Sequence, residues 1–136
     1  MADYTVKKIT ELDTLSGFLD GIEMRQVRED LGIESFGISI VEMEPDASEA
    51  PEHDHSSEGK GGEMFAKFPA QLEQEELYLA LSGSGTVTLD GTEHDLTPEV
   101  IVHIGPTVTR KVVAGPDGLR LLAVGGVPGK AYGDDA

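Results

Sequence analysis

Two histidines set two positions apart are the residues of this chain best suited to hold a metal ion. His53 and His55 lie on a short polar stretch that begins at Pro51. On an extended segment, residues two apart point to the same face. Both imidazoles can therefore reach one point, as a first-row metal ion requires. The alternative is a pair of solvent-exposed loop histidines, because the neighbouring side chains are mostly acidic.

A carboxylate further along the chain offers a third ligand. Glu76 lies at the start of an apolar run and shares a strand face with Tyr78 and Ala80. Burying a lone carboxylate is costly, so an inward-facing Glu76 needs a partner. Two neutral imidazoles and one carboxylate would form a facial triad that leaves coordination positions open.

The spacing of these residues resembles the first motif of the cupin family, which reads H-x-H, a short gap, E, six residues and G. Here His53-x-His55 is followed by Glu76, and Gly83 comes after six further residues. The gap before Glu76 is 20 residues long, where the family typically has three or four. The second half of the motif therefore matches in full, and the first half carries an insertion.

The resemblance covers residues 36–124 and implies an all-β fold, the double-stranded β-helix or jelly-roll barrel. It also implies a divalent metal (Fe, Mn, Ni or Zn) held in the barrel interior by His53, His55 and Glu76, with Tyr78 lining the pocket. Cupins include dioxygenases, isomerases and decarboxylases, and nothing in the sequence selects among them, because a fold does not fix a function. No residue stands out as a catalytic acid or base.

The second cupin motif is degenerate in this chain. The family pattern is G, five residues, P-x-G, two residues, H, three residues and N. Its positions fall here on residues of other types: Glu99, Gly105, Thr107, Arg110 and Ala114. The change at the last metal ligand matters most, since a guanidinium has no lone pair to offer a metal ion.

This change leaves three interpretations of the barrel interior. In the first, a metal binds through the two histidines and Glu76, and Arg110 holds an anionic group of the ligand. In the second, Arg110 pairs with Glu76 and takes the place of the metal. In the third, Arg110 points outward and is an ordinary surface residue.

The rest of the pattern predicts short strands at regular spacing, as in a sandwich or barrel. Asp90-Gly91 is the strongest hairpin signal, and glycine-rich turns are expected at 82–85 and 115–118. A short helix or turn is expected over 10–20, where leucines recur at helical spacing. The predicted strands cover residues 33–43, 77–81, 86–89, 100–104, 109–113 and 119–124.

One long segment, 56–74, interrupts this pattern of regularly spaced short strands. It begins with several glycines and contains Phe65 and Phe68. A loop of this length inside a compact domain is usually functional or disordered. We expect the two aromatic side chains to form either a lid over the barrel mouth or a small satellite core.

The length of 136 residues predicts one domain with a single core. We expect this cupin domain to span 1–136, with its core over 33–126 and an irregular tail over 125–136. No apolar stretch is long enough to span a membrane, and the N-terminus lacks the features of a signal peptide. We therefore expect a cytoplasmic protein.

The charge of the chain excludes several partners. Its 26 acidic and 10 basic residues give a formal net charge of -16, which would repel nucleic acids and anionic membrane surfaces. The absence of cysteine excludes disulfides and thiolate metal sites. The acidity is typical either of an ordinary acidic protein or of adaptation to high salt.

An inward-facing Glu76 would turn the leucines at 77, 79 and 81 outward. Because exposed apolar patches are unfavourable, we expect the N-terminal segment or a second subunit to cover them, and homodimers are common among cupins.

The sequence predicts a small metal-binding cupin that binds or acts on a small molecule, with an anionic group as one option. The alternative is a non-catalytic, metal-free binding or sensing module in which Arg110 replaces the metal.

Overall fold

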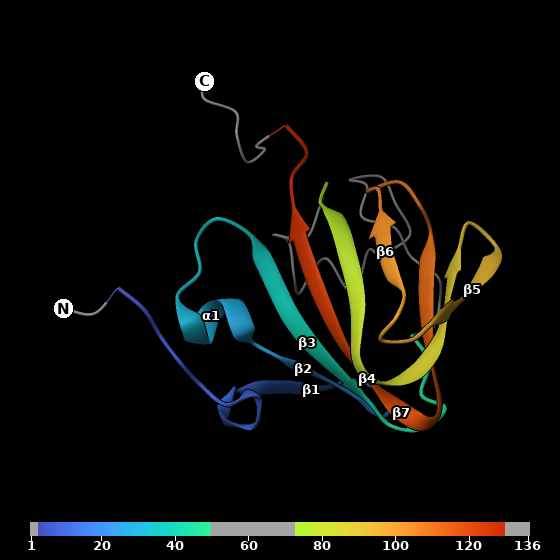
Figure 1. Ribbon diagram of the computed structural model, residues 1–136, viewed down its shortest axis with the longest axis horizontal. Helices are drawn as coiled ribbons and strands as arrows, with labels where there is room; N and C mark the ends of the chain where they lie inside the picture. Colours follow the sequence, from blue (N-terminus) through green and yellow to red (C-terminus); the bar gives the residue numbers. More distant parts are fainter. Residues whose placement is uncertain (1–2, 50–72, 130–136) are drawn as a thin grey trace.

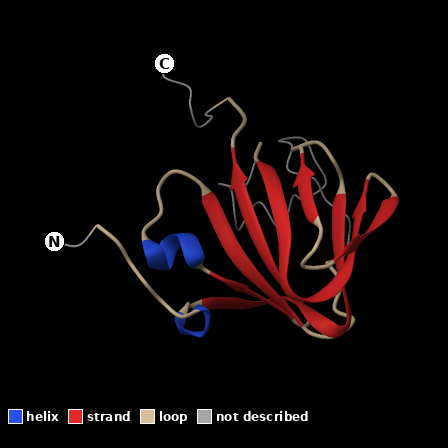
Figure 2. Cartoon of the chain, in the orientation of Figure 1, coloured by secondary structure: helices blue, strands red, loops and turns tan. Residues whose placement is uncertain are grey.

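The structure is a computed structural model that describes residues 3–49 and 73–129. Within these residues the chain forms one curved antiparallel sheet of seven strands, accompanied by two short helical segments (Figure 2). In chain order the elements are η1 (Ile9–Glu11), β1 (Thr14–Leu19), β2 (Ile22–Arg25), α1 (Val27–Leu31), β3 (Gly37–Met43), β4 (Glu75–Leu89), β5 (Thr92–Leu96), β6 (Ile101–Ile104) and β7 (Arg110–Gly126).

Two long strands, β4 and β7, form the centre of the sheet and pair with each other along their whole length. The strand order is β1-β2-β3-β7-β4-β5, and β6 pairs with the first half of β4. The second half of β4 pairs with β5 instead. Figure 1 shows both long strands curving, so that they contribute to both walls of the barrel. This arrangement confirms the predicted all-β jelly roll.

Glycines let β4 and β7 approach each other closely where they bend. Gly83 and Gly118 have φ angles of 75° and 78°, and a Cβ atom on Gly83 would lie 2.2 Å from the carbonyl oxygen of Gly118. The register between the strands shifts on both sides of Gly83, as it does at β-bulges. The turns predicted at 82–85 and 115–118 are therefore wrong, because these glycines bend two continuous strands instead of ending them.

The helix predicted over 10–20 is also wrong. The 3-10 helix η1 is a single turn, and the residues after it form β1, which pairs with β2 across a turn at Asp20-Gly21. Hydrogen bonds between these strands outweigh the weak helical preference of a segment that contains Gly17. The α-helix lies further along the chain as α1, which ends at Gly32 in the left-handed conformation.

The hairpin predicted at Asp90-Gly91 is confirmed. Both residues have positive φ angles, 47° and 85°, which a type I′ turn requires. The turn joins β4 to β5, whose residues pair directly across it.

The barrel interior forms the main core, and a smaller cluster lies outside the sheet. In the smaller cluster, Leu12 and Val27 from the N-terminal segment and α1 pack against Ile40 of β3. Figure 1 shows α1 beside β3. None of the helices in the described ranges is long and apolar enough to cross a membrane. The buried residues of the interior are Ile22, Val41, Met43, Tyr78, Ala80, Val87, Leu96, Val102, Ile104, Val112, Ala114, Leu119, Leu121 and Ala123.

Candidate functional site

A guanidinium group lies buried inside the barrel. Arg110 is the first residue of β7, and its side chain has no exposed surface. Val112 and Ala114, on the same face of the strand, are buried as well, so the alternation of the strand places Arg110 in the interior. It is the one buried charged residue among those that the structure describes. The interpretation that Arg110 is a surface residue is therefore wrong.

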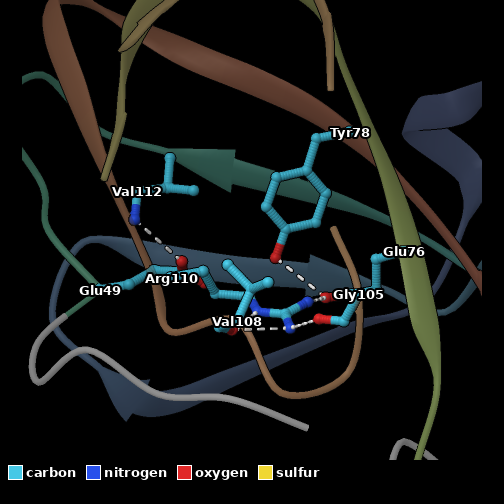
Figure 3. Close-up of polar contacts among 7 residues, drawn as sticks. All are labelled: Glu49, Glu76, Tyr78, Gly105, Val108, Arg110 and Val112. Atoms are coloured by element: carbon cyan, nitrogen blue, oxygen red, sulfur yellow. Dashed lines mark hydrogen bonds and ion pairs between the residues drawn. The ribbon is translucent and has the colours of Figure 1, made fainter. Parts of the chain in front are cut away.

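Arg110 donates hydrogen bonds to one carboxylate and two main-chain carbonyl groups (Figure 3). Its Nη1 donates to Oε1 of Glu76 at 2.8 Å, and its Nη2 donates to the carbonyl oxygen of Gly105 at 2.7 Å. The carbonyl oxygen of Val108 accepts from Nη2 at 3.0 Å and from Nε at 3.3 Å. A guanidinium carries five N–H groups, so one hydrogen on Nη1 is left over from these contacts.

Glu76 reaches the guanidinium from the start of β4. Its side chain is 11% exposed, and its Oε1 also accepts a hydrogen bond from the Tyr78 hydroxyl at 3.1 Å. Burial raises the pKa of Glu76, while Arg110 and the Tyr78 hydroxyl act in the opposite direction. Burial, together with the nearby glutamates, raises the pKa of the Tyr78 hydroxyl well above its usual value.

A second carboxyl, that of Glu49, faces the same interior, and the sequence analysis did not find it. Glu49 follows β3 in a short segment that runs beside β7, and its N–H donates to the carbonyl oxygen of Val112 at 2.9 Å. Its Oε1 accepts a hydrogen bond from the Val112 N–H at 3.1 Å (Figure 3). Burial, and then the negative charge of Glu76, raise the pKa of Glu49 to about 7, although the Val112 N–H and Arg110 oppose this shift.

One weak pattern in the sequence agrees with an inward-facing Glu49. The alternation that places His53 and His55 on one face of an extended segment continues backward to position 49. A residue that far from the histidine pair belongs to no motif, so only its location beside β7 shows that it faces the interior.

Four of the predicted site residues lie outside the described part of the chain: His53, His55, Phe65 and Phe68. Their predicted roles as metal ligands and as a lid stay predictions. The other two histidines lie on the outside of the barrel. The Nε2 atom of His103 is 2.6 Å from Oε1 of Glu75, and His94 is exposed on β5.

The described part of the interior does not fit a metal ion by itself. Among the residues that the structure describes, no three of the types His, Cys, Asp and Glu converge on one point. Oε1 of Glu76 already accepts hydrogen bonds from Arg110 and Tyr78. A guanidinium 2.8 Å from this oxygen repels a second cation at the same place. Within the described residues, Glu76 forms an ion pair with Arg110.

A separate open cleft lies on the outside of the sheet, where it is lined by residues of β2, β3, β4 and β7. Glu42 is bonded there to Arg25 at 2.7 Å and to Arg120 at 2.9 Å. Burial favours the neutral form of Glu42, but the two arginines lower its pKa overall. Because these charges satisfy one another, they do not mark a ligand site.

Comparison with known proteins agrees with this architecture. No family model matches the chain. A stretch of 45 residues, 33% of the chain, is 47% identical to dimethylsulfoniopropionate lyase DddW of Ruegeria pomeroyi. The match spans only 30% of the length of that curated relative.

Solved structures resemble the chain over nearly its whole length. A cupin protein from Bacteroides fragilis has a TM-score of 0.69 at 20% identity, and the alignment covers 98% of this chain and 92% of that one. An RmlC-like cupin from Shewanella frigidimarina has a TM-score of 0.64 at 14% identity, with 100% and 97% covered. The chain therefore has the fold of these cupins, which is the fold that the resemblance of its first motif implies.

The fold leaves the activity open. Other structural neighbours are described as a sugar phosphate isomerase, a polyketide cyclase and a predicted oxalate decarboxylase, all at 20% identity or less. Since unrelated reactions occur on this one barrel, a function for this chain has to be argued from its own interior residues.

Proposed function

We propose that the barrel interior binds a small organic molecule without a metal ion, and that Arg110 stands in the place of the metal. The observation that carries this proposal is the ion pair of 2.8 Å between Arg110 and Glu76, in which the arginine side chain has no exposed surface. A buried ion pair is stable only when its remaining hydrogen-bonding groups are also satisfied. The carbonyl groups of Gly105 and Val108 and the Tyr78 hydroxyl meet this requirement except at one N–H of Arg110 Nη1.

The polar groups of the interior indicate what such a ligand carries. The remaining N–H of Arg110 Nη1 is a donor, so it calls for an acceptor oxygen on the ligand. The charge of Arg110 is already balanced by Glu76. An anionic ligand therefore gains less binding free energy here than it would beside an unpaired arginine. We infer a polar ligand with a carbonyl or carboxyl oxygen, held mainly by hydrogen bonds and by contact with the Tyr78 ring.

A metal-binding cupin, with or without enzymatic activity, is the second candidate. Glu76 faces the interior, as the cupin resemblance requires of a metal ligand. In that function the histidine pair and Glu76 would hold the ion, which would supply a Lewis acid or an oxygen-binding centre. The two candidate functions differ in whether the interior holds a metal ion. The residue type at position 110 bears on this difference, because histidine can bind a metal and arginine cannot.

Replacing Arg110 with histidine is the decisive experiment. We expect wild-type protein, purified without added metal, to contain no stoichiometric Fe, Mn, Ni or Zn by mass spectrometry of the dissolved metal. Arg110→His would complete a four-ligand set and gain about one Zn²⁺ per chain, and His53→Ala in that background would abolish the gain. Wild-type protein that carries a stoichiometric metal, lost in His53→Ala, would contradict the proposal.

Ligand binding is measured by the thermal shift that small molecules cause. The probes are short carboxylates and carbonyl compounds, together with dimethylsulfoniopropionate, for which the partial relative is named. We expect a binder to raise the Tm of the wild type and of Arg28→Lys, an exposed control. It should not raise the Tm of Arg110→Lys, since lysine lacks the planar fork of donors. An equal shift in Arg110→Lys would rule out the barrel site.

The same probe set tests for catalysis. Release of dimethyl sulfide from dimethylsulfoniopropionate, followed by gas chromatography of the headspace, would show that the chain is a lyase like its partial relative. Binding without turnover would instead support the binding or sensing module.

A further inference from the structure

We infer that Glu49 is the acid of the barrel interior that holds a proton and exchanges it with a bound ligand, so that the site takes ligands with a basic or proton-donating group. This inference rests on the proposed function, because it assigns a role to a second carboxyl group in the same interior. It goes further by naming the group that can move a proton there.

The main chain of β7 holds the Glu49 carboxyl in place. Oε1 accepts the Val112 N–H at 3.1 Å, and the Glu49 N–H donates to the carbonyl oxygen of the same residue at 2.9 Å. A neighbouring bridge between Ser48 and Val113 fixes the segment against the strand. Among the described residues nothing bonds to Oε2, which is therefore the oxygen that can carry a proton.

Two carboxyl groups share one cation among the interior residues that the structure describes. In the described part of the chain, the ionisable groups that act on Glu49 are Glu76 and Arg110, and the Tyr78 hydroxyl of β4 is affected by both glutamates. Arg110 directs its hydrogen bonds to Glu76 and to main-chain carbonyl groups, and none of them to Glu49. Two carboxylates that act on each other beside one guanidinium, in a site with little exposure to water, cannot both ionise at low cost. The proton is held by the carboxyl that lacks the ion pair, which is Glu49.

The other interior groups are poorly suited to exchange a proton near neutral pH. Arg110 stays protonated at any physiological pH. Burial and the nearby glutamates hold the pKa of the Tyr78 hydroxyl well above its usual value. Among the described interior residues, Glu49 is the group whose pKa, at about 7, matches the operating range of a general acid or base. Its proton would pass from Oε2 to a basic atom of the ligand, or a ligand proton would pass to Oε2.

A purely structural role for Glu49 makes a different prediction. If the carboxyl only accepts the Val112 N–H, a glutamine amide oxygen can replace it, and ionisation of residue 49 has no consequence. Glu49→Gln keeps the shape and the acceptor but removes the titration. This variant therefore separates the structural role from the proton-exchanging role without depending on a loss of folding.

The experiment is an NMR titration of ligand-free protein labelled with ¹³C at the glutamate Cδ, between about pH 4 and pH 9. We expect one resonance with a midpoint near 7, absent in Glu49→Gln and unchanged in Glu44→Gln, an exposed control. Glu76→Gln removes a nearby negative charge and releases Arg110, so the midpoint should fall. A Glu49 midpoint near 4.5, the ordinary value, or an unchanged midpoint in Glu76→Gln would overturn the inference.

A ligand identified by thermal shift extends the test. Its affinity should change with the same midpoint, and the pH dependence should disappear in Glu49→Gln. An affinity that is independent of pH would overturn the inference while leaving the barrel site intact. Conversely, a screen that finds no binder would contradict the proposed function and would leave the outcome of the titration unaffected.

Discussion

Arg110 and Glu76 lie in the barrel interior, where either charge without its partner would destabilise the folded protein. Removing one member of a buried ion pair typically destabilises a protein by about 3–5 kcal/mol, because the remaining charge has no compensation. Loss of the guanidinium would also remove the hydrogen bonds that it donates to the carbonyl groups of Gly105 and Val108, and among the described residues the Gly105 carbonyl would keep only the Val108 N–H at 3.2 Å. The pair therefore supports the loop between β6 and β7 as well as the site.

Arg110→Met should lower the free energy of unfolding by about 3–5 kcal/mol at pH 8 and by less at pH 5. Without the guanidinium, the pKa of Glu76 in the folded protein rises further above its usual value of 4.5. When the pKa of a carboxyl group is higher in the folded than in the unfolded protein, the free energy of unfolding is unaffected at pH values below the pKa of the unfolded state. It decreases as the pH rises through the pKa of the folded state. Urea unfolding of both proteins at the two pH values measures the difference.

The control for this prediction also removes the carboxyl group of Glu76. The double variant Arg110→Met with Glu76→Gln should lose much less stability between pH 5 and pH 8, because residue 76 can no longer ionise. An equal loss in the single variant at both pH values would mean that the loss does not depend on the ionisation of Glu76.

At the level of elements, the site depends on how β4 and β7 curve. Arg110 pairs across the ladder with Leu89, whereas Glu76 pairs with Gly125. The two charged residues therefore lie at opposite ends of the same pair of strands. Their side chains meet at 2.8 Å because the bent strands close into a barrel and bring the ends of the ladder toward each other.

Gly83→Ala tests the close crossing that produces this bend. A Cβ atom there would lie 2.2 Å from the carbonyl oxygen of Gly118, so the strands must move apart. We expect a loss of about 2–4 kcal/mol, from overpacking in addition to the positive φ. Gly91→Ala is the matched control, because Gly91 also has a positive φ but no atom lies within 4 Å of its Cβ position.

Chemical denaturation of both variants measures the contribution of the crossing. Gly91→Ala should lose only about 1–2 kcal/mol, the cost of a left-handed conformation. Equal losses in the two variants would show that the backbone conformation, and not the approach of the strands, makes glycine necessary at position 83.

At the level of the whole molecule, the outer face of the barrel carries the apolar side chains that the alternation of β4 predicts. Leu81 is 38% exposed, and Ile101 on the neighbouring β6 is 68% exposed. The N-terminal segment covers a different part of this face, around Ile40 and Leu122. A second subunit over β4 and β6 stays a prediction, as does the homodimer.

Ile101→Lys tests that prediction. If two copies pack through this face, a buried lysine without a partner would weaken the dimer, and sedimentation velocity would show a shift from twice the chain mass of 14.5 kDa toward the monomer. Val6→Lys makes the same charge change at a residue that is 85% exposed and should leave the dimer intact. A wild-type protein that is monomeric at all concentrations would refute the dimer.

The sequence by itself determined which strand face each residue occupies. The alternation around Glu76 predicts that its side chain and those of the leucines beside it lie on opposite faces, because side-chain direction in a strand depends only on local geometry. The cupin resemblance adds that the face of Glu76 is the inner one. The Asp90-Gly91 turn was predicted for the same reason, since its positive φ angles are a local requirement. The resemblance of the residue spacing to the first cupin motif predicted the barrel as a whole.

Only the tertiary structure decided which interior residues meet. Arg110 and Glu76 are 34 positions apart, and their contact follows from barrel closure, which no local pattern encodes. The same closure brings Glu49 beside β7 and turns an apparently ordinary loop acid into the second carboxyl of the interior. Burial and neighbouring charge, both properties of the folded barrel, then set the pKa on which the inferred chemistry depends.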